Sequence, residues 1–421
     1  MKRKRIHFLF LNVGHFLDHF FMLIFAAVAS LRLSREWGME YSELIPLATP
    51  GFVAFGLASI PVGWLADKWS REGMMTIFFI GIGIGSIATS LAQSPLQMAI
   101  GLFAIGVFAA IYHPVGLAMV VQGRKRTGIP LAINGVFGNL GVACAALITG
   151  FLIDNTGWRS AFIVPGILTI AIGIGYGLFL RHGRKRSESG LEAAAGASAA
   201  KAEPLVIARS TLVRVFSIIV FTTAIGGLTY QSGTFALPEI LEERLEGLAD
   251  SATEIGAYAF VVFAVASLAQ LAIGYLVDRH SMRTVFAFVG ATQALFLLLM
   301  MNLSGWPALI VATAFMLAVF GQIPINDVLV GRIARSEWRS RAYSIRYIVN
   351  FSVMATTLPL IAWIHATRGF GALFALLSIA AGMVCIAALL LPIRSRIVLP
   401  SISSASPEAQ GGTAVPGSRA T

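Results

Sequence analysis

The sequence predicts an all-α integral membrane protein with twelve transmembrane helices, arranged as two six-helix pseudo-repeated bundles. Composition is the first reason: 57% of the 421 residues are hydrophobic and only 12% are charged, which lies outside the usual range for a soluble domain. Apolar stretches of membrane-spanning length are the second reason. The third is a repeat, because a segment that begins at Gly63 returns at Gly274, 211 positions later. Such internal duplication in a membrane protein is typical of transporters.

The expected spans follow from the thickness of the bilayer. A helix rises about 1.5 Å per residue, so about 20 apolar residues are needed to cross roughly 30 Å of hydrocarbon. The stretches that meet this requirement are Phe8–Leu31, Leu44–Trp64, Met74–Ala92, Leu96–Val121, Ile129–Ile153, Ala161–Leu180, Val215–Leu237, Ile255–Val277, Val285–Leu303, Ala308–Val330, Ala342–His365 and Phe370–Ile393.

A polar segment separates the first six spans from the last six. We therefore expect an N-terminal bundle over residues 1–180, a cytoplasmic linker over 181–211 and a C-terminal bundle over 212–394. The linker is basic at first and then rich in Ala, Gly, Ser and Glu, without an apolar period. Residues 395–421 are rich in Ser, Pro, Gly and Ala, which predicts a disordered cytoplasmic tail.

The charges of the loops predict the orientation. Most Lys and Arg residues lie in loops on the side of the N-terminus, whereas the opposite side holds Arg32, Arg35, Arg159, Arg244 and Arg368. Cytoplasmic loops retain positive charge, so we expect both termini in the cytoplasm and the chain in a bacterial inner membrane. The net charge of +11 then reflects topology and contact with anionic lipid, and nucleic-acid binding is not expected.

The repeated segment carries Gly, three residues, Asp and then a basic residue. The two copies supply Gly63, Asp67, Lys68, Arg71, Gly274, Asp278 and Arg279. Their loops, after the second and eighth spans, resemble the signature loop of the major facilitator superfamily, and the resemblance covers all twelve spans. A Gly permits close helix packing, and an Asp can accept hydrogen bonds from a helix N-terminus. We therefore expect the seven residues to form a cytoplasmic latch between the halves. The alternative is a basic turn that only sets topology.

Polar groups at membrane depth are the candidates for function, because ionisable side chains there cost several kcal/mol and mark pathways. Asp18 lies roughly 18 Å into the first span, near the bilayer midplane. His15 shares its helical face, and His19 lies one turn after His15. A carboxylate beside imidazoles can hold or release a proton near neutral pH. His15, Asp18 and His19 are therefore the proton-coupling candidates; the alternative is a polar clamp that fixes helix packing.

The fourth span contains Tyr112, His113 and Pro114, where a kink is expected because Pro removes a helical hydrogen bond. This segment, with Gly14–Asp18 and Asn134–Gly141, resembles the fosmidomycin-resistance branch of the superfamily, a group of drug exporters. The resemblance implies efflux and makes Tyr112, His113, Asn134 and Asn139 candidates to line the substrate cavity. A buried, hydrogen-bonded histidine is the alternative for His113.

The sequence also departs from the exporters. An acidic and a basic residue that commonly follow His-Pro in that branch are replaced by Val115 and other apolar residues, which leaves the substrate open. Antiporters of the superfamily commonly carry an Arg in the fourth helix and a Gly-Pro series in the fifth. Leu102–Gly106 contains no Arg, and Gly141–Gly150 contains no Pro.

In the second half, Pro324 is expected to break the tenth span beside Asp327. Asp327 and Arg346 both lie about one turn from the cytoplasmic interface, so they can form an ion pair. Alternatively, Arg346 snorkels to the headgroups or faces the cavity, where its guanidinium would suit a carboxylate or phosphate. Further cavity candidates with hydrogen-bonding side chains are Tyr230, Gln231, Gln322 and Asn350.

Together these features predict a monomeric secondary transporter that works by alternating access and exports a drug-like or anionic compound in exchange for protons. Import of a small organic anion is the alternative. The sequence lacks the residue spacing expected of an enzyme, a phosphate-binding loop for ATP, and the soluble domain of a sensor. Cys144 and Cys385 show no metal-ligand spacing or disulfide framework. The expected partners are therefore a small solute, protons and lipid, with no cofactor or metal.

Overall fold

The structure is a computed structural model that describes residues 2–122, 128–187, 209–333 and 339–392. Most of the predicted linker and the whole predicted tail lie outside these ranges. Within them the chain is helical and contains no strand. The elements are α1 (Lys2–Val28), the π-helix η1 (Ala29–Leu33), α2 (Ser34–Trp37), α3 (Tyr41–Leu44), the 3-10 helix η2 (Ile45–Ala48), α4 (Thr49–Lys68), α5 (Arg71–Ser90), α6 (Pro95–Ala109), the π-helix η3 (Tyr112–Gly116), α7 (Leu117–Val121), α8 (Gly128–Thr156), α9 (Trp158–Ser187), α10 (Arg209–Arg244), α11 (Ala252–Arg279), α12 (Met282–Leu299), the 3-10 helix η4 (Met300–Asn302), α13 (Gly305–Ile333) and α14 (Arg339–Leu389).

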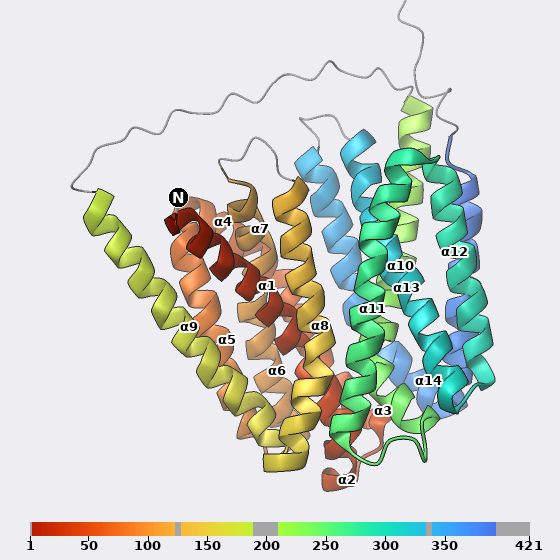
Figure 1. Ribbon diagram of the computed structural model, residues 1–421, viewed down its shortest axis with the longest axis horizontal. Helices are drawn as coiled ribbons and strands as arrows, with labels where there is room; N and C mark the ends of the chain where they lie inside the picture. Colours follow the sequence, from red (N-terminus) through yellow and green to blue (C-terminus); the bar gives the residue numbers. More distant parts are fainter. Residues whose placement is uncertain (1, 123–127, 188–208, 334–338, 393–421) are drawn as a thin grey trace, which may run out of the picture.

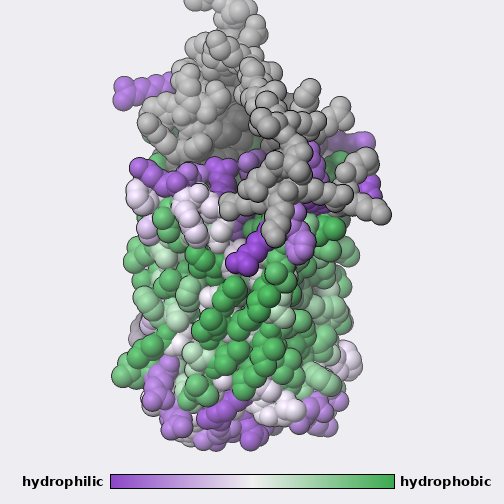
Figure 2. Space-filling model, turned by 90° about the vertical axis from the view of Figure 1, so that its left-hand side faces the viewer, coloured by the Kyte–Doolittle hydropathy of each residue, from purple (hydrophilic) through white to green (hydrophobic). Residues whose placement is uncertain are grey.

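The predicted all-helical membrane fold is confirmed. Among the described residues, 11 helical segments are long and apolar enough to cross a membrane. The last of them lies in α14, which turns sharply at Gly369. The φ of Gly369 is 69°, a left-handed conformation that glycine adopts without strain. Two spans thus follow one another in α14, so the described chain has the expected twelve. On the face seen in Figure 2, an apolar band separates two polar ends.

Local sequence accounts for the ends and interruptions of these helices. Ser70 caps α5 by accepting a hydrogen bond from the backbone N–H of Gly73, as expected for a serine at the N-cap position. The fourth span is interrupted after Ala109 and continues as the π-helix η3, which contains Pro114. π-Helical turns are common at functional sites. This interruption redirects the chain between α6 and α7.

The break expected at Pro324 is wrong, because α13 is helical from Gly305 to Ile333. Proline removes one backbone N–H, but residues on both sides of Pro324 are hydrogen-bonded to α10. Gln322 Nε2 donates to the backbone oxygen of Thr222 at 3.1 Å, and Thr222 Oγ1 donates to Asn326 Oδ1 at 3.0 Å. These tertiary hydrogen bonds keep the helix continuous where its own ladder is weakened.

The two halves stand side by side, with α1–α9 in red to yellow and α10–α14 in green to blue (Figure 1). They meet where α8 packs on α11 and where α4 packs on α14. At the α8–α11 contact the backbones touch: a Cβ on Gly150 would lie 2.2 Å from Ala252 O, and one on Gly256 would lie 2.5 Å from Ala146 O. Small residues at these positions allow the close approach.

Within the first half, α4 and α6 approach equally closely. A Cβ on Gly106 of α6 would lie 2.0 Å from the backbone oxygen of Gly51 on α4. Gly51 cannot move aside for a side chain, because the contacting atoms belong to the backbone of α4. The pair therefore fixes the helix that leads into η3.

We expect Gly106→Ala to lower the thermal stability of the purified protein, because its methyl group would overlap the backbone of α4. Overpacking of this kind costs about 1–3 kcal/mol. Thermal unfolding in detergent measures the effect. Gly175→Ala on α9 is the matched control, since a Cβ there meets nothing within 4 Å. Equal melting temperatures for the two variants would contradict the proposed contact.

Candidate functional site

The centre of the candidate site is Asp18 on α1, whose residue exposure is 0%. Its Oδ2 lies 3.3 Å from Nε2 of His113, a residue of η3. Among the described residues, neither carboxylate oxygen has another hydrogen-bond partner. The interruption of the fourth span thus brings an imidazole against the one carboxylate of α1 at membrane depth.

His15 lies beside this pair and is held in one orientation. Its Nδ1 donates to the backbone oxygen of Asn134 on α8 at 2.7 Å. Because a carbonyl oxygen can only accept, Nδ1 carries the proton and Nε2 is left as an acceptor when the ring is neutral. His15 Nε2 is buried and has no partner among the described residues.

A buried hydrogen-bond network fixes the helices that carry these groups. Tyr112 donates its hydroxyl to Leu11 O at 2.8 Å, and Asn134 Nδ2 donates to Tyr112 Oη at 2.8 Å and to Asn12 Oδ1 at 2.9 Å. Tyr112 and Asn134 are both 0% exposed. The sequence suggested that both residues line a cavity, whereas the structure uses them to join α1, η3 and α8.

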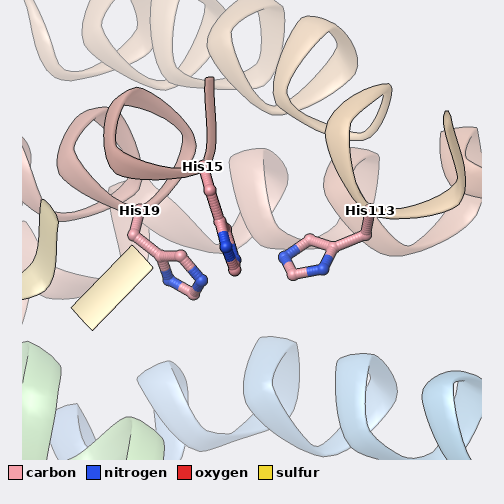
Figure 3. Close-up of side chains that lie close together, drawn as sticks. All are labelled: His15, His19 and His113. Carbon is pink, nitrogen blue, oxygen red and sulfur yellow. The ribbon is translucent and has the colours of Figure 1, made fainter. Parts of the chain in front are cut away.

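Three histidines, His15, His19 and His113, lie close together (Figure 3). His15 and His19 project from α1, and His113 projects from η3 toward them. The ring of His113 stands edge-on to both others, with centroids 5.5 Å from His15 and 5.6 Å from His19. The His113 side chain retains 18% exposure. From the sequence, His113 is a candidate to line the substrate cavity and is not among the proton-coupling candidates of α1.

The polar candidates of the second half contact different partners and do not form one cluster. Gln231 and Gln322 are buried, and Gln322 is engaged with α10 as described above. Asn350 Nδ2 lies 3.3 Å from Met354 Sδ on the next turn. Arg346 forms an ion pair with Asp327. Of the three arrangements considered for Arg346, the structure therefore has the ion pair.

Two further candidates lie near the boundary between the halves. Asn139 Oδ1 accepts a long hydrogen bond of 3.5 Å from Gln270 Nε2 of α11 in the other half. The ring of Tyr230 on α10 packs against Phe320, with centroids 5.6 Å apart. Among the described residues, neither side chain is hydrogen-bonded to a histidine of the cluster.

The first copy of the repeated loop is internally paired. Arg71 Nη2 donates to Asp67 Oδ1 at 2.6 Å, one turn away. Lys68 lies 5.2 Å from the ring of Trp64. In the second copy Arg279 lies 4.3 Å from the ring of Tyr275, at the matching positions. A Cβ on Gly63 would make only an ordinary contact of 3.5 Å with Pro114, and one on Gly274 would meet nothing within 4 Å. A latch between the halves stays a prediction.

Further polar contacts between the halves lie at the end opposite the N-terminus, and the sequence did not predict them. Asp154, at the end of α8, accepts hydrogen bonds from the backbone N–H groups of Ala252 (3.3 Å) and Thr253 (2.7 Å), at the start of α11. Arg35 also forms an ion pair with Glu242 of α10 at 2.6 Å. No local pattern links residues so far apart in sequence.

Comparison with known proteins supports the membrane fold. The family model described as "Major Facilitator Superfamily" matches residues 11–248 and 219–410. A "Gallate transporter" from Pseudomonas putida is 22% identical over 33% of this chain, and a "Probable L-galactonate transporter" from Escherichia coli strain K12 is 25% identical over 43%. The matched regions span 32% and 41% of these relatives, well under half of their length.

A solved structure shares the fold over nearly the whole chain. It is a "POT family transporter in complex with 5-aminolevulinic acid", which superposes with a TM-score of 0.71 at 13% identity. The superposition covers 91% of this chain and 95% of the other. At this identity the likeness concerns the fold alone.

We expect Asp154→Ala to favour separation of the halves at the end opposite the N-terminus, because the start of α11 loses its acceptor. Loss of such a cap costs about 0.5–2 kcal/mol, which shifts a two-state ratio about 2- to 30-fold. Spin labels at Gln93 and Ser304, in a variant without Cys144 and Cys385, report the distance by double electron–electron resonance.

Asn155→Ala is the control, since Asn155 Nδ2 donates to Phe151 O within α8 itself. The distance distribution should move to longer values in the Asp154 variant and stay unchanged in the Asn155 variant. Identical distributions in wild type and Asp154→Ala would remove Asp154 from the contact between the halves.

Proposed function

The chain belongs to the Major Facilitator Superfamily, and from this membership and the buried site we propose that it is a secondary active transporter. It moves a small organic solute across the bacterial inner membrane by alternating access, as a monomer with both termini in the cytoplasm. The proposed coupling ion is the proton. Family membership supports transport, and the distribution of basic loops supports the orientation.

The observation that carries the proposal is the contact between Asp18 and His113. A carboxylate at this depth is costly unless a nearby group offsets its charge. With one proton between them the pair is neutral, with two it is cationic, and with none it is anionic. The number of bound protons therefore changes the charge that a solute meets.

Coupling then follows from linkage. If the solute binds more tightly to one protonation state, its binding changes the proton affinity of the site. Proton binding then changes the solute affinity by the same factor. His15 and His19, also on α1, lie beside His113 (Figure 3). We propose that His15, Asp18 and His19 act together with His113 as the coupling site.

Export in exchange for protons is the proposed direction. The resemblance of the segments around Asp18, His113 and Asn139 to the fosmidomycin-resistance exporters supports it. Import of a small organic anion is the second candidate. The similarity to a gallate transporter and to a probable L-galactonate transporter favours that candidate. Both candidates use the same site and differ in the direction in which the solute moves relative to the proton.

We expect Asp18→Asn to abolish transport driven by a pH gradient while the protein still folds, because the amide cannot exchange a proton. Reconstituted vesicles with an imposed gradient, tested against organic anions and hydrophobic drugs, measure solute and proton flux together. Asp250→Asn, an exposed carboxylate in the loop before α11, is the matched control and should transport like wild type.

The sign of the flux separates export from import. Solute-dependent proton movement opposite to the solute supports exchange, and movement in the same direction supports import with protons. Undiminished gradient-driven transport by the Asp18 variant would refute proton coupling at this residue. Retained solute exchange without a gradient would show that the variant still binds and moves its solute.

A further inference from the structure

Two ring nitrogens in the histidine cluster are buried without a hydrogen-bond partner among the described residues. They are His15 Nε2 and His113 Nδ1. An unsatisfied buried polar atom costs about 1–3 kcal/mol, so two of them in one cluster require an explanation. Both belong to rings whose other nitrogen is engaged, by Asn134 O for His15 and by Asp18 for His113.

We propose that His15, His19 and His113 form a binding site for a divalent transition-metal ion of the zinc class. Each histidine offers one ring nitrogen, and the three nitrogens lie within 4.8 Å of one another. Zinc–nitrogen bonds of 2.0–2.1 Å place ligand nitrogens about 3.4 Å apart in a tetrahedral site. The separations between the nitrogens must therefore shorten by at most about 1.4 Å to reach bonding geometry.

The surrounding contacts match those of a metal site. A histidine that binds a metal normally donates its other ring N–H to a carbonyl or carboxylate, which fixes the ring and its tautomer. His15 donates Nδ1–H to a backbone oxygen, and His113 Nε2 faces the Asp18 carboxylate. The free nitrogen of His15 is Nε2, and the His113 nitrogen turned toward the other two rings is Nε2, beside the Asp18 carboxylate (Figure 3). Asp18 also supplies negative charge beside a cation at membrane depth.

The chemistry of the donors selects the ion. Imidazole nitrogen suits zinc, copper, nickel and iron, whereas magnesium and calcium prefer oxygen ligands. Three protein ligands leave one position open, as in catalytic zinc sites. The His113 side chain retains 18% exposure, whereas its Nδ1 and His15 Nε2 are buried. All three ligands belong to the first half, so a bound ion would not tie the halves together.

A second cluster provides an internal comparison. Glu239, Glu243 and His365 also place their ligand atoms within 4.8 Å. There, however, His365 Nε2 and Glu243 Oε1 already contact each other at 2.7 Å. Those two groups satisfy one another, although Glu239 Oε2 and His365 Nδ1 are also buried without a hydrogen-bond partner among the described residues. In the histidine cluster all three donors are imidazole nitrogens, and none of the three rings is hydrogen-bonded to another. The observations therefore favour the histidine cluster.

The test is metal binding by the purified full-length chain in detergent, after treatment with a chelator. Zn²⁺ is titrated by calorimetry and Co²⁺ by its visible absorption, which reports coordination geometry. We expect one equivalent bound to wild type, with a low-symmetry or tetrahedral Co²⁺ spectrum. His19→Asn and His113→Ala should each weaken binding at least 10-fold, and Asp18→Asn should weaken it about 10- to 100-fold by loss of the group that orients His113.

Two control variants separate this site from others. His280→Ala removes an exposed histidine, and His365→Ala disrupts the second cluster; both should bind like wild type. Absence of binding in wild type, or loss of binding only in His365→Ala, would overturn the proposal. Thermal unfolding without metal checks that each variant is folded. Because binding is measured without transport, a negative result leaves the transporter proposal standing.

Discussion

The absence of water at membrane depth is the constraint on which this structure depends. Every polar group in the hydrocarbon region must find a partner within the protein. In the first half, Asp18 lies against His113, and the network of Tyr112 and Asn134 holds their helices in place. The π-helix η3 is the local consequence, because it places Tyr112 and His113 together against α1.

The two halves are joined by a different kind of contact. At the α8–α11 boundary, glycines let the backbones touch, and Asp154 caps the helix of the other half. These contacts lie at the end opposite the N-terminus. The acidic residue of the first repeated loop, at the other end, is instead satisfied by Arg71 one turn away. One end of the molecule thus has strong polar contacts between its halves, while the first loop copy at the other end is paired within itself.

The candidate site shows how far sequence reasoning reaches. His15, Asp18 and His19 were recognisable because charged groups are rare in apolar helices. The partner of Asp18 was not, since His113 lies in another span and only packing brings the two together. The expected break at Pro324 failed for a related reason. Side chains of α10 and α13 bond to each other across that position, and no local pattern announces such bonds.

Sequence alone determined the membrane environment, the spans and the duplication, because hydropathy, length and repetition are properties of consecutive residues. The Major Facilitator fold followed from these together with the repeated loop. Tertiary structure alone decided which polar groups meet: Asp18 with His113, His15 with Asn134, and Asp154 with the start of α11. These pairings depend on the rotation and depth at which each helix packs against its neighbours, and apolar spans specify neither by themselves.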